Sequence, residues 1–280
     1  MHAIYRGRFA PSPTGALHLG HARTYLVAWL RARQAGGSIV MRIEDLDAPR
    51  TVAGAAESIC DDMRWLGIDW DEGPFWQSQR FERYERALAR LLDAGLAYPC
   101  SCTRKEIAAL ASAPHGADEL GPRYPGTCRD GAQHPDRPCS VRFRMPDPGD
   151  DFVVRRADGV WSYQLAVVVD DAEMAITEVV RGDDLLPSTP RQVALYRALG
   201  REPPDFLHVP LVLGAGGARL SKRDGAAAIG ELRRHHSPDE VVGMLAASLG
   251  LPPSPASPTD LLPAFDPAHI PAEPHCFSKE

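Results

Sequence analysis

Two short segments, far apart in the sequence, carry residue types suited to phosphate chemistry. The first contains His18 and His21, three positions apart, where a loop rich in proline and glycine is expected to turn into a helix. A helix start offers free N–H groups and a positive dipole end to a phosphate. The second contains Lys222 in a glycine-flanked loop, a compact charge able to reach a triphosphate. Either segment alone would indicate only surface residues, but together they predict an ATP site.

The residues around both segments resemble the class I aminoacyl-tRNA synthetases. His18-Leu19-Gly20-His21 resembles the family's His-x-Gly-His element, and Arg219-Leu220-Ser221-Lys222-Arg223 resembles its Lys-Met-Ser-Lys-Ser loop. Three further stretches resemble the glutamyl branch of that family, namely residues 8–15, 42–47 and 180–185. The resemblance covers most of the chain, from about residue 5 to residue 250.

The resemblance implies an ATP-dependent ligase that makes glutamyl-adenylate, with Mg²⁺ carried in by ATP. It places five residues at ATP, and three of these, His18, His21 and Lys222, act as catalytic groups; the full set is His18, Gly20, His21, Ser221 and Lys222. Negative charge grows on the α-phosphate as a carboxylate attacks it, and donors positioned in advance lower the barrier. Lys222 would neutralise the pyrophosphate as it leaves.

L-glutamate is expected to be bound by groups that complement two carboxylates and one ammonium. The resemblance puts Arg8 and Tyr163 at the side-chain carboxylate, Ser12 and Glu44 at the ammonium, and Arg181 at the remaining acidic end. Arginine grips a carboxylate with two parallel hydrogen bonds. Which arginine takes which carboxylate stays open, and without the motif a structural ion pair would explain both Glu44 and Arg181.

One position departs from the glutamyl pattern. Many glutamyl-tRNA synthetases carry Asn four residues after the pocket tyrosine, whereas this chain has Val167. The pocket loses a polar partner there, so we expect weaker glutamate binding.

A group of cysteines predicts a structural metal site. The spacing of Cys100, Cys102, Tyr124 and Cys128 resembles the zinc site of this family's insertion domain, where three thiolates and one phenolate close a tetrahedral site. Spacing alone gives Cys139, His134 or His115 equal weight as the fourth ligand, and a reduced, metal-free cluster is the alternative. Cys60 is expected in the core, and Cys276 carries no assignment.

The elements that must position these residues predict an α/β fold with a Rossmann-like catalytic core. A strand over 7–10, a helix over 20–34 and a strand over 38–43 form a β-α-β unit. Ligands lie beyond the carboxyl ends of such strands, so His18, His21 and Glu44 should face one crevice.

Further elements are predicted along the rest of the chain. Helices are expected over 51–66, from a cap at Ser78 to Gly95, after a cap at Ser188, and over 237–250 from a Ser237–Glu240 capping box. Later strands are expected near 175–181 and 206–213. The final thirty residues contain eight prolines and no periodicity, which predicts a tail that is extended, packed or mobile.

These elements divide into four expected segments. Residues 1–97 form the first half of the core, and residues 98–160 form a small inserted domain that binds zinc and contacts the acceptor. Residues 161–215 form the second half of the core. Residues 216–280 carry the lysine loop, a short helical segment that contacts the RNA stem, and the proline-rich tail.

Composition limits the environment and the partners. The net charge of −6 gives no global attraction to nucleic acid, so RNA contact needs a local basic face, for which Arg142, Arg144, Arg155 and Arg156 are candidates; a solvated edge explains these four equally well. Only three of the 31 basic residues are lysines, which favours a role for Lys222. No apolar stretch predicts a signal or a membrane span, so we expect a soluble, cytoplasmic protein. We also expect it to be a monomer.

The segment after the lysine loop suggests the acceptor. Full glutamyl-tRNA synthetases continue into a helical anticodon-binding domain, whereas this sequence continues into the proline-rich tail. The family members with this truncation attach glutamate to the queuosine base in the anticodon stem-loop of tRNA(Asp). The alternatives are a truncated glutamyl-tRNA synthetase that charges a tRNA 3′ end, a nucleotidyltransferase of a small metabolite, and a non-catalytic RNA-binding paralogue.

Overall fold

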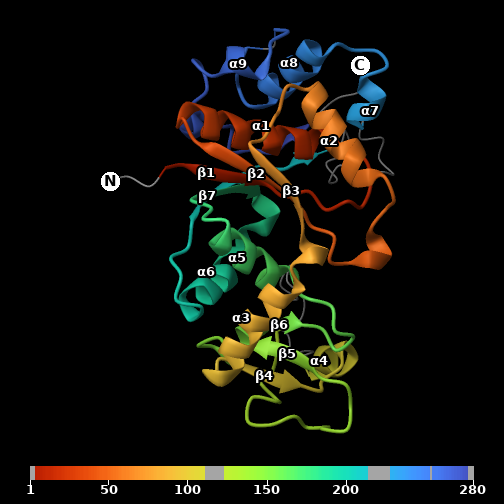
Figure 1. The fold of residues 1–280 in the computed structure, drawn as a ribbon, viewed down its shortest axis with the longest axis vertical. Coiled ribbons are helices and arrows are strands. Elements are labelled where there is room, and N and C mark those ends of the chain that lie inside the picture. The colour runs from red at the N-terminus through yellow and green to blue at the C-terminus, as the bar shows by residue number, and fades with distance from the viewer. Residues whose placement is uncertain (1–3, 111–122, 214–227, 253, 277–280) are drawn as a thin grey trace. The chain divides into compact units, whose positions relative to one another are not determined.

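The computed structural model describes residues 4–110, 123–213, 228–252 and 254–276. The chain forms two compact units, each assembled from separate stretches of sequence. The first unit contains residues 1–76, 175–186 and 204–280, and the second contains residues 77–174 and 187–203. Figure 1 traces both units with colours that follow the residue number.

The first unit carries the parallel strands and the helices around them. Its elements are β1 (Arg6–Phe9), α1 (Leu19–Gln34), β2 (Ser38–Ile43), α2 (Ala55–Trp65), β3 (Glu72–Trp76), β7 (Glu178–Gly182), β8 (Asp205–Val209), β9 (Val212–Leu213), α7 (Ile229–Leu232), α8 (Pro238–Ser248), α9 (Pro258–Leu261) and β10 (His275–Cys276). Those of the second unit are α3 (Phe81–Asp93), β4 (Ala97–Cys100), α4 (Arg104–Leu110), β5 (Ser140–Phe143), β6 (Phe152–Arg155), α5 (Tyr163–Glu173) and α6 (Thr189–Ala198).

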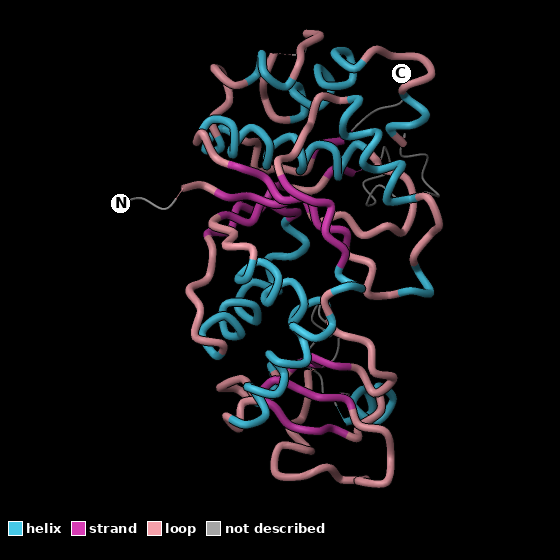
Figure 2. The backbone as a smooth tube through the Cα atoms, in the orientation of Figure 1, coloured by secondary structure: helices cyan, strands magenta, loops and turns pink. Residues whose placement is uncertain are grey.

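The strands of the first unit form a Rossmann-type arrangement. Strands β1, β2 and β3 pair in parallel, and so do β7 and β8. The backbone N–H of Thr177, just before β7, donates to the carbonyl of Arg6 on β1 at 2.8 Å. The spatial order is therefore β3–β2–β1–β7–β8, and the strand order reverses between β1 and β7, the switch point at which such sheets bind ligands. The strands appear in magenta in Figure 2.

The two faces of this sheet differ in composition. Phe9, Met41 and Val180 belong to the apolar core that also contains Leu26, Leu30 and other residues of α1. Because side chains alternate along a strand, the neighbours of these core residues project from the opposite face. Those neighbours include Arg8, Arg42 and Arg181, together with the apolar Val40 and Val179. One face of the sheet therefore packs against α1, and the other carries the three arginines.

The second unit combines a small sheet with three longer helices. Strands β4, β5 and β6 pair antiparallel in that order. The buried carboxylate of Asp170 on α5 accepts hydrogen bonds from Gln77, Arg80 and Tyr84. These bonds tie the start of α3 to α5, because a buried carboxylate must be paired.

Most helix and strand predictions are confirmed, and the exceptions concern caps and the ends of elements. The helix over 20–34, the strand over 38–43 and the capping box of Ser237 and Glu240 are confirmed. Ser78 does not cap α3, because it lies in a short 3₁₀ turn and Arg80 takes the N-cap position. The Ser188 hydroxyl accepts from the Gln164 amide instead of capping α6.

Two longer predictions also need correction. The helix expected over 51–66 begins only at Ala55, after a 3₁₀ turn at Ala48–Arg50. The strand expected over 206–213 is interrupted at Pro210, which has no N–H to donate, and becomes β8 and β9. In the tail, the described residues contain the short helix α9 and the strand β10. No helix among the described residues is both long and apolar enough to cross a membrane.

Candidate functional site

The two histidines lie side by side at the start of α1. His18 is the N-cap residue with an extended backbone, its side chain makes no capping bond, and the first turn holds no acidic residue. The imidazoles of His18 and His21 stack with ring centroids 3.9 Å apart. The N–H groups of this turn are therefore not used by a side-chain cap, which suits the binding of a phosphate.

Both imidazoles are neutral at neutral pH. Burial lowers the pKa of His18 to about 4, and the nearby His21 lowers it further. The imidazole of His21 reaches the surface, yet partial desolvation still lowers its pKa. Neutral imidazoles carry one N–H each, so the pair can donate hydrogen bonds to phosphate oxygens without adding full charges.

Gly20 allows a close approach between the first motif and β9. A Cβ at this position would lie 3.3 Å from Nδ1 of His18 and 3.6 Å from Cβ of Val212. A larger residue would press on the imidazole. The glycine between the histidines thus has a local steric reason.

The chain on either side of the lysine loop is bound to the first motif. Ala228 forms an antiparallel β-bridge with His18, and the N–H of Ile229 donates to the carbonyl of Leu17 at 2.8 Å. On the other side, Val212 packs close to Gly20. Ser221 and Lys222 themselves lie outside the described residues, so their assigned roles stay predictions. The flanks of the two segments nevertheless come together.

Arg8 and Glu44 lie on the sheet face opposite α1. The Arg8 guanidinium is buried and donates to the carbonyl of Val180 at 3.0 Å. Nη2 of Arg42 lies 3.0 Å from Oε1 of Glu44, and the Glu44 N–H donates to the carbonyl of Pro11. These contacts hold the Glu44 carboxylate at the carboxyl end of β2. Its expected role toward an ammonium stays a prediction.

Tyr25 connects this region with the histidines. Its ring centroid lies 6.4 Å from that of His21 and 5.3 Å from that of Phe9. Burial raises the pKa of the Tyr25 hydroxyl, the Glu44 carboxylate raises it further, and the Arg8 guanidinium opposes this. Glu44, Arg8 and His21 therefore all lie near this tyrosine, and the crevice that the histidines and Glu44 would face stays a prediction.

Arg181 is held by contacts with two rings of β8. Its guanidinium carbon lies 4.8 Å from the ring centroid of Phe206, and its Nε donates to Nε2 of His208 at 3.2 Å. Desolvation and then the Arg181 charge lower the pKa of His208. The imidazole stays neutral, so its Nε2 can accept the bond and fix the arginine.

The remaining residues predicted to bind the substrate glutamate, Ser12 and Tyr163, lie in different parts of the fold. Ser12 is exposed in the loop before α1. Tyr163 is the first residue of α5, after the N-cap Ser162, and belongs to the second unit, as does the buried Val167. A pocket shared by Tyr163 and Arg8 stays a prediction.

Three of the predicted metal ligands form a cluster in the second unit. The sulfurs of Cys100, Cys102 and Cys128 all lie within 4.8 Å of one another. The Tyr124 hydroxyl accepts from the N–H of Cys128 at 2.8 Å and lies 3.4 Å from the sulfur of Cys100. Tetrahedral zinc with Zn–S bonds of about 2.3 Å keeps its sulfurs about 3.8 Å apart. The 3.5 Å between the sulfurs of Cys102 and Cys128 fits this.

The surroundings favour ionisation of one thiol. Burial acts to raise the pKa of Cys128, but hydrogen bonds from the backbone of Gln133 and Ser101 outweigh it and lower the pKa to about 6. Burial and the neighbouring thiols raise the pKa of Cys102 to about 12. Arg142 donates to the sulfur of Cys100 at 3.3 Å and covers the Tyr124 ring at 3.9 Å. The donor set fits a thiolate-bound cation.

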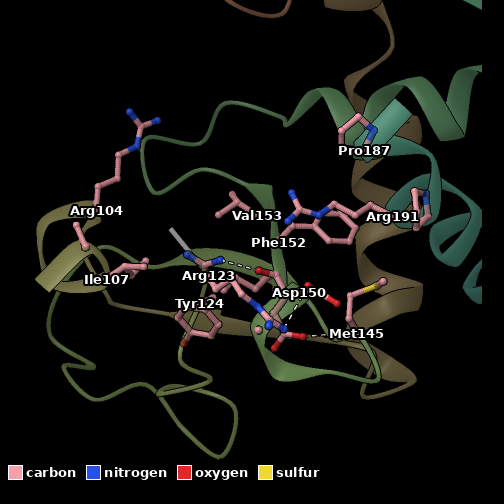
Figure 3. Close-up of a pocket in the computed structure, with 15 residues that line it drawn as sticks. Arg104, Ile107, Arg123, Tyr124, Met145, Asp150, Phe152, Val153, Pro187 and Arg191 are labelled. Atoms are coloured by element: carbon pink, nitrogen blue, oxygen red, sulfur yellow. Dashed lines mark hydrogen bonds and ion pairs between the residues drawn. The ribbon is translucent and has the colours of Figure 1, made fainter. Parts of the chain in front are cut away.

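A cavity of about 670 Å³ lies beside this cluster, entirely within the second unit. Four guanidinium groups and an aromatic ring contribute to its lining, from Arg104, Arg123, Arg142, Arg191 and Phe152. Figure 3 shows the Arg191 side chain against the Phe152 ring, and the guanidinium carbon lies 5.5 Å from the ring centroid. Asp150 and Asp151 also line the cavity, so its lining carries more positive than negative groups. The cavity suits an anion with a flat, apolar part.

Several supporting residues were not assigned from the sequence. Arg42 could have been found, because a spacing of two on a strand places it on the same face as Glu44. The same spacing relates Phe206 and His208, whose rings stack 6.2 Å apart. Of the cavity's arginines, only Arg142 was a candidate from the sequence; Arg104, Arg123 and Arg191 come from separate elements and gave no local signal.

Comparison with known proteins agrees with this geometry. A family model described as tRNA synthetases class I (E and Q), catalytic domain, matches residues 5–257. Among curated proteins, the glutamyl-Q tRNA(Asp) synthetase of Symbiobacterium thermophilum is 52% identical, over 96% of this chain and 94% of the relative. The protein of the same description from Nocardia farcinica is 49% identical, over 96% of this chain and 91% of the relative.

A solved structure of a glutamate tRNA ligase is also similar to this chain. The glutamate tRNA ligase of Elizabethkingia meningosepticum, crystallised with its amino acid, matches 99% of this chain and 67% of its own with a TM-score of 0.78 and 28% identity.

Proposed function

Because the chain belongs to the class I tRNA synthetases (E and Q), we propose that it activates L-glutamate with ATP and transfers the glutamyl group to queuosine in tRNA(Asp). The relatives from Symbiobacterium and Nocardia are named for that activity, and this chain matches them over nearly their whole length. Activation should proceed without tRNA, since the assigned residues all belong to this chain.

The observation that carries the proposal is the convergence of the two signature segments. The His18–Ala228 bridge and the bond from Ile229 to Leu17 bring the end of the lysine loop to the histidine pair. His18 and His21 then serve the α-phosphate from the start of α1, and Lys222 serves the leaving pyrophosphate with Mg²⁺. Gly20 and Ser221 complete the proposed ATP site.

The sheet face opposite α1 supports glutamate as the substrate. Arg8 and Arg181 offer two fixed guanidinium groups for two carboxylates, and Arg42 fixes the Glu44 carboxylate for an ammonium. Ser12 and Tyr163 are proposed to join them. Held arginines lose little entropy on binding, so they favour a dicarboxylate over a neutral amino acid.

We further propose a structural zinc ion held by Cys100, Cys102, Cys128 and Tyr124. Bound zinc would fix the turn around Cys128 to the end of β4, with no position left open for substrate. The neighbouring cavity is proposed to contact the RNA, because guanidinium groups hold phosphates and a ring such as Phe152 can stack on a base. The four-segment division of the chain, its monomeric state and its cytoplasmic location are part of this proposal.

The acceptor distinguishes this function from charging of a tRNA 3′ end. Labelled glutamate and ATP are incubated with tRNA(Asp) from cells that make queuosine and from cells that do not. Label should enter only the first, should remain after removal of the 3′-terminal adenosine, and should also enter an isolated anticodon stem-loop that carries queuosine. Equal labelling of both tRNAs would instead favour 3′-end charging.

A further inference from the structure

Arg23 on α1 is a buried cation held by backbone carbonyls. Its side chain is 1% exposed, and its guanidinium donates to the carbonyl of Pro210 at 2.5 Å and of Ser248 at 3.1 Å. Its Nε has no hydrogen-bond partner among the described residues. Burial lowers the pKa of Arg23 to about 10, with Asp183 opposing this, so it stays charged at neutral pH.

The carbonyls that Arg23 binds belong to chain segments that lead toward the ATP site. Pro210 connects β8 with β9, and β9 ends at Leu213, immediately before the segment that contains Lys222. Ser248 is the last residue of α8. Arg23 lies two positions after His21, so one side chain links the histidine helix to the approach of the lysine loop.

The tail holds β9 as well. Strand β10 pairs with β9 in parallel, with His275 opposite Val212 and Cys276 opposite Leu213. The N–H of His275 donates to the carbonyl of Leu211 at 3.1 Å. Strand β9 is therefore held by hydrogen bonds to the tail, while Arg23 holds the chain shortly before it.

We infer that Arg23 is a positioning residue for the ATP-dependent step, assisted by His275, and that it sets where β9 ends relative to His18 and His21. This inference rests on the proposed function. Burying a cation costs solvation free energy, which the hydrogen bonds to two carbonyls offset only in part, so stability alone explains little of the presence of Arg23. Its value then lies in the geometry it imposes, because a misplacement of about 1 Å far from the chemistry can cost about 100-fold in rate.

The test compares Arg23→Met with Arg33→Met in glutamate-dependent pyrophosphate exchange. Arg33 lies on the same helix, but it pairs with Asp69 and Asp71, away from β9. Arg23→Met should lower kcat about 10- to 100-fold and leave the KM for glutamate nearly unchanged, whereas Arg33→Met should leave both unchanged. Arg23→Lys should rescue poorly, because one ammonium does not reproduce the planar fork.

A second variant tests the same inference in case Arg23→Met does not fold. His275→Pro removes the N–H that binds Leu211 and leaves the core untouched. It should also lower kcat without a change in the KM for glutamate. Hydrogen exchange should speed up at residues 205–213 in both variants and stay unchanged in Arg33→Met.

The outcomes separate the inference from the proposed function. Wild-type kcat in Arg23→Met, or unchanged exchange at residues 205–213, would overturn the inference while leaving the proposed function intact. An acceptor other than queuosine would overturn the proposed function without affecting this assay, because exchange needs only adenylate formation. A wild-type chain inactive in exchange would also refute the proposed function, and hydrogen exchange would still test the link between Arg23 and β9.

Discussion

His18 and His21 stack at the start of α1 with their ring centroids 3.9 Å apart and their planes 29° from parallel. Two imidazoles in such contact cannot both carry a proton without repulsion, and burial of His18 adds to this cost. The pair is thereby kept in the neutral form near neutral pH.

The first prediction concerns stability in acid. The unfolded chain protonates His18 near its ordinary pKa of 6.5, whereas the folded chain does so only near 4. Between these values the unfolded state binds more protons, so stability is lost as the pH falls through this window. The melting temperature of the wild type should therefore fall more steeply from pH 7 to pH 4.5 than that of His18→Gln. If the melting temperatures of the wild type and His18→Gln fell in parallel with pH, the lowered pKa of His18 would be refuted.

The second prediction concerns Lys222. Replacement by Ala should reduce pyrophosphate exchange by about 100- to 1,000-fold, because one charge that stabilises the transition state is lost. Binding of glutamate, measured by calorimetry, should change little. Arg should restore little activity, since its planar fork does not act as a point charge. Near wild-type exchange in Lys222→Ala would remove the proposed role.

The third prediction concerns the metal. Protein purified without chelator should contain one zinc per chain, and Cys128→Ser should lose it together with the order of the second unit. Cys139→Ser is the matched control, because Cys139 lies outside the cluster and donates to the carbonyl of Arg137. Tyr124→Phe tests the fourth ligand by the same metal analysis. Full activity without zinc would contradict the proposal.

The fourth prediction concerns RNA. Arg191→Ala should raise the KM for tRNA and reduce the slope of log affinity against log salt by about one, as expected when one phosphate contact is lost. Adenylate formation should be unchanged. Arg197→Ala, on the exposed last turn of the same helix, is the control. An unchanged salt slope in Arg191→Ala would show that the cavity does not hold the RNA.

Local sequence signals predicted the elements well where one residue decides the outcome. The capping box at Ser237 and Glu240 is of this kind. Ser78 and Ser188 failed as caps because hydroxyls are equally suited to turns and to other side chains. The break at Pro210 was predictable, because a proline inside a strand removes one ladder hydrogen bond.

Contacts between distant segments could not be predicted in the same way. The placement of β7 beside β1 depends on Thr177 and Arg6, which are far apart in the sequence. Arg23 is one of 28 arginines (31 basic residues less three lysines), and its charge gave no sign of burial against two carbonyls. The motifs could be identified from their residues, but the distant groups that hold them in place could not be predicted.

The pairing of β9 with β10 also bears on the order of folding. His275 lies 63 positions after its partner Val212 (275 minus 212), whereas Arg6 of β1 and its partner Ser38 of β2 are 32 positions apart (38 minus 6). During synthesis the earlier parts of a chain fold first, and contacts between distant positions form slowly. The approach to the lysine loop is therefore completed only after the tail has emerged from the ribosome. In refolding experiments, the recovery of pyrophosphate exchange should lag behind the recovery of helical signal.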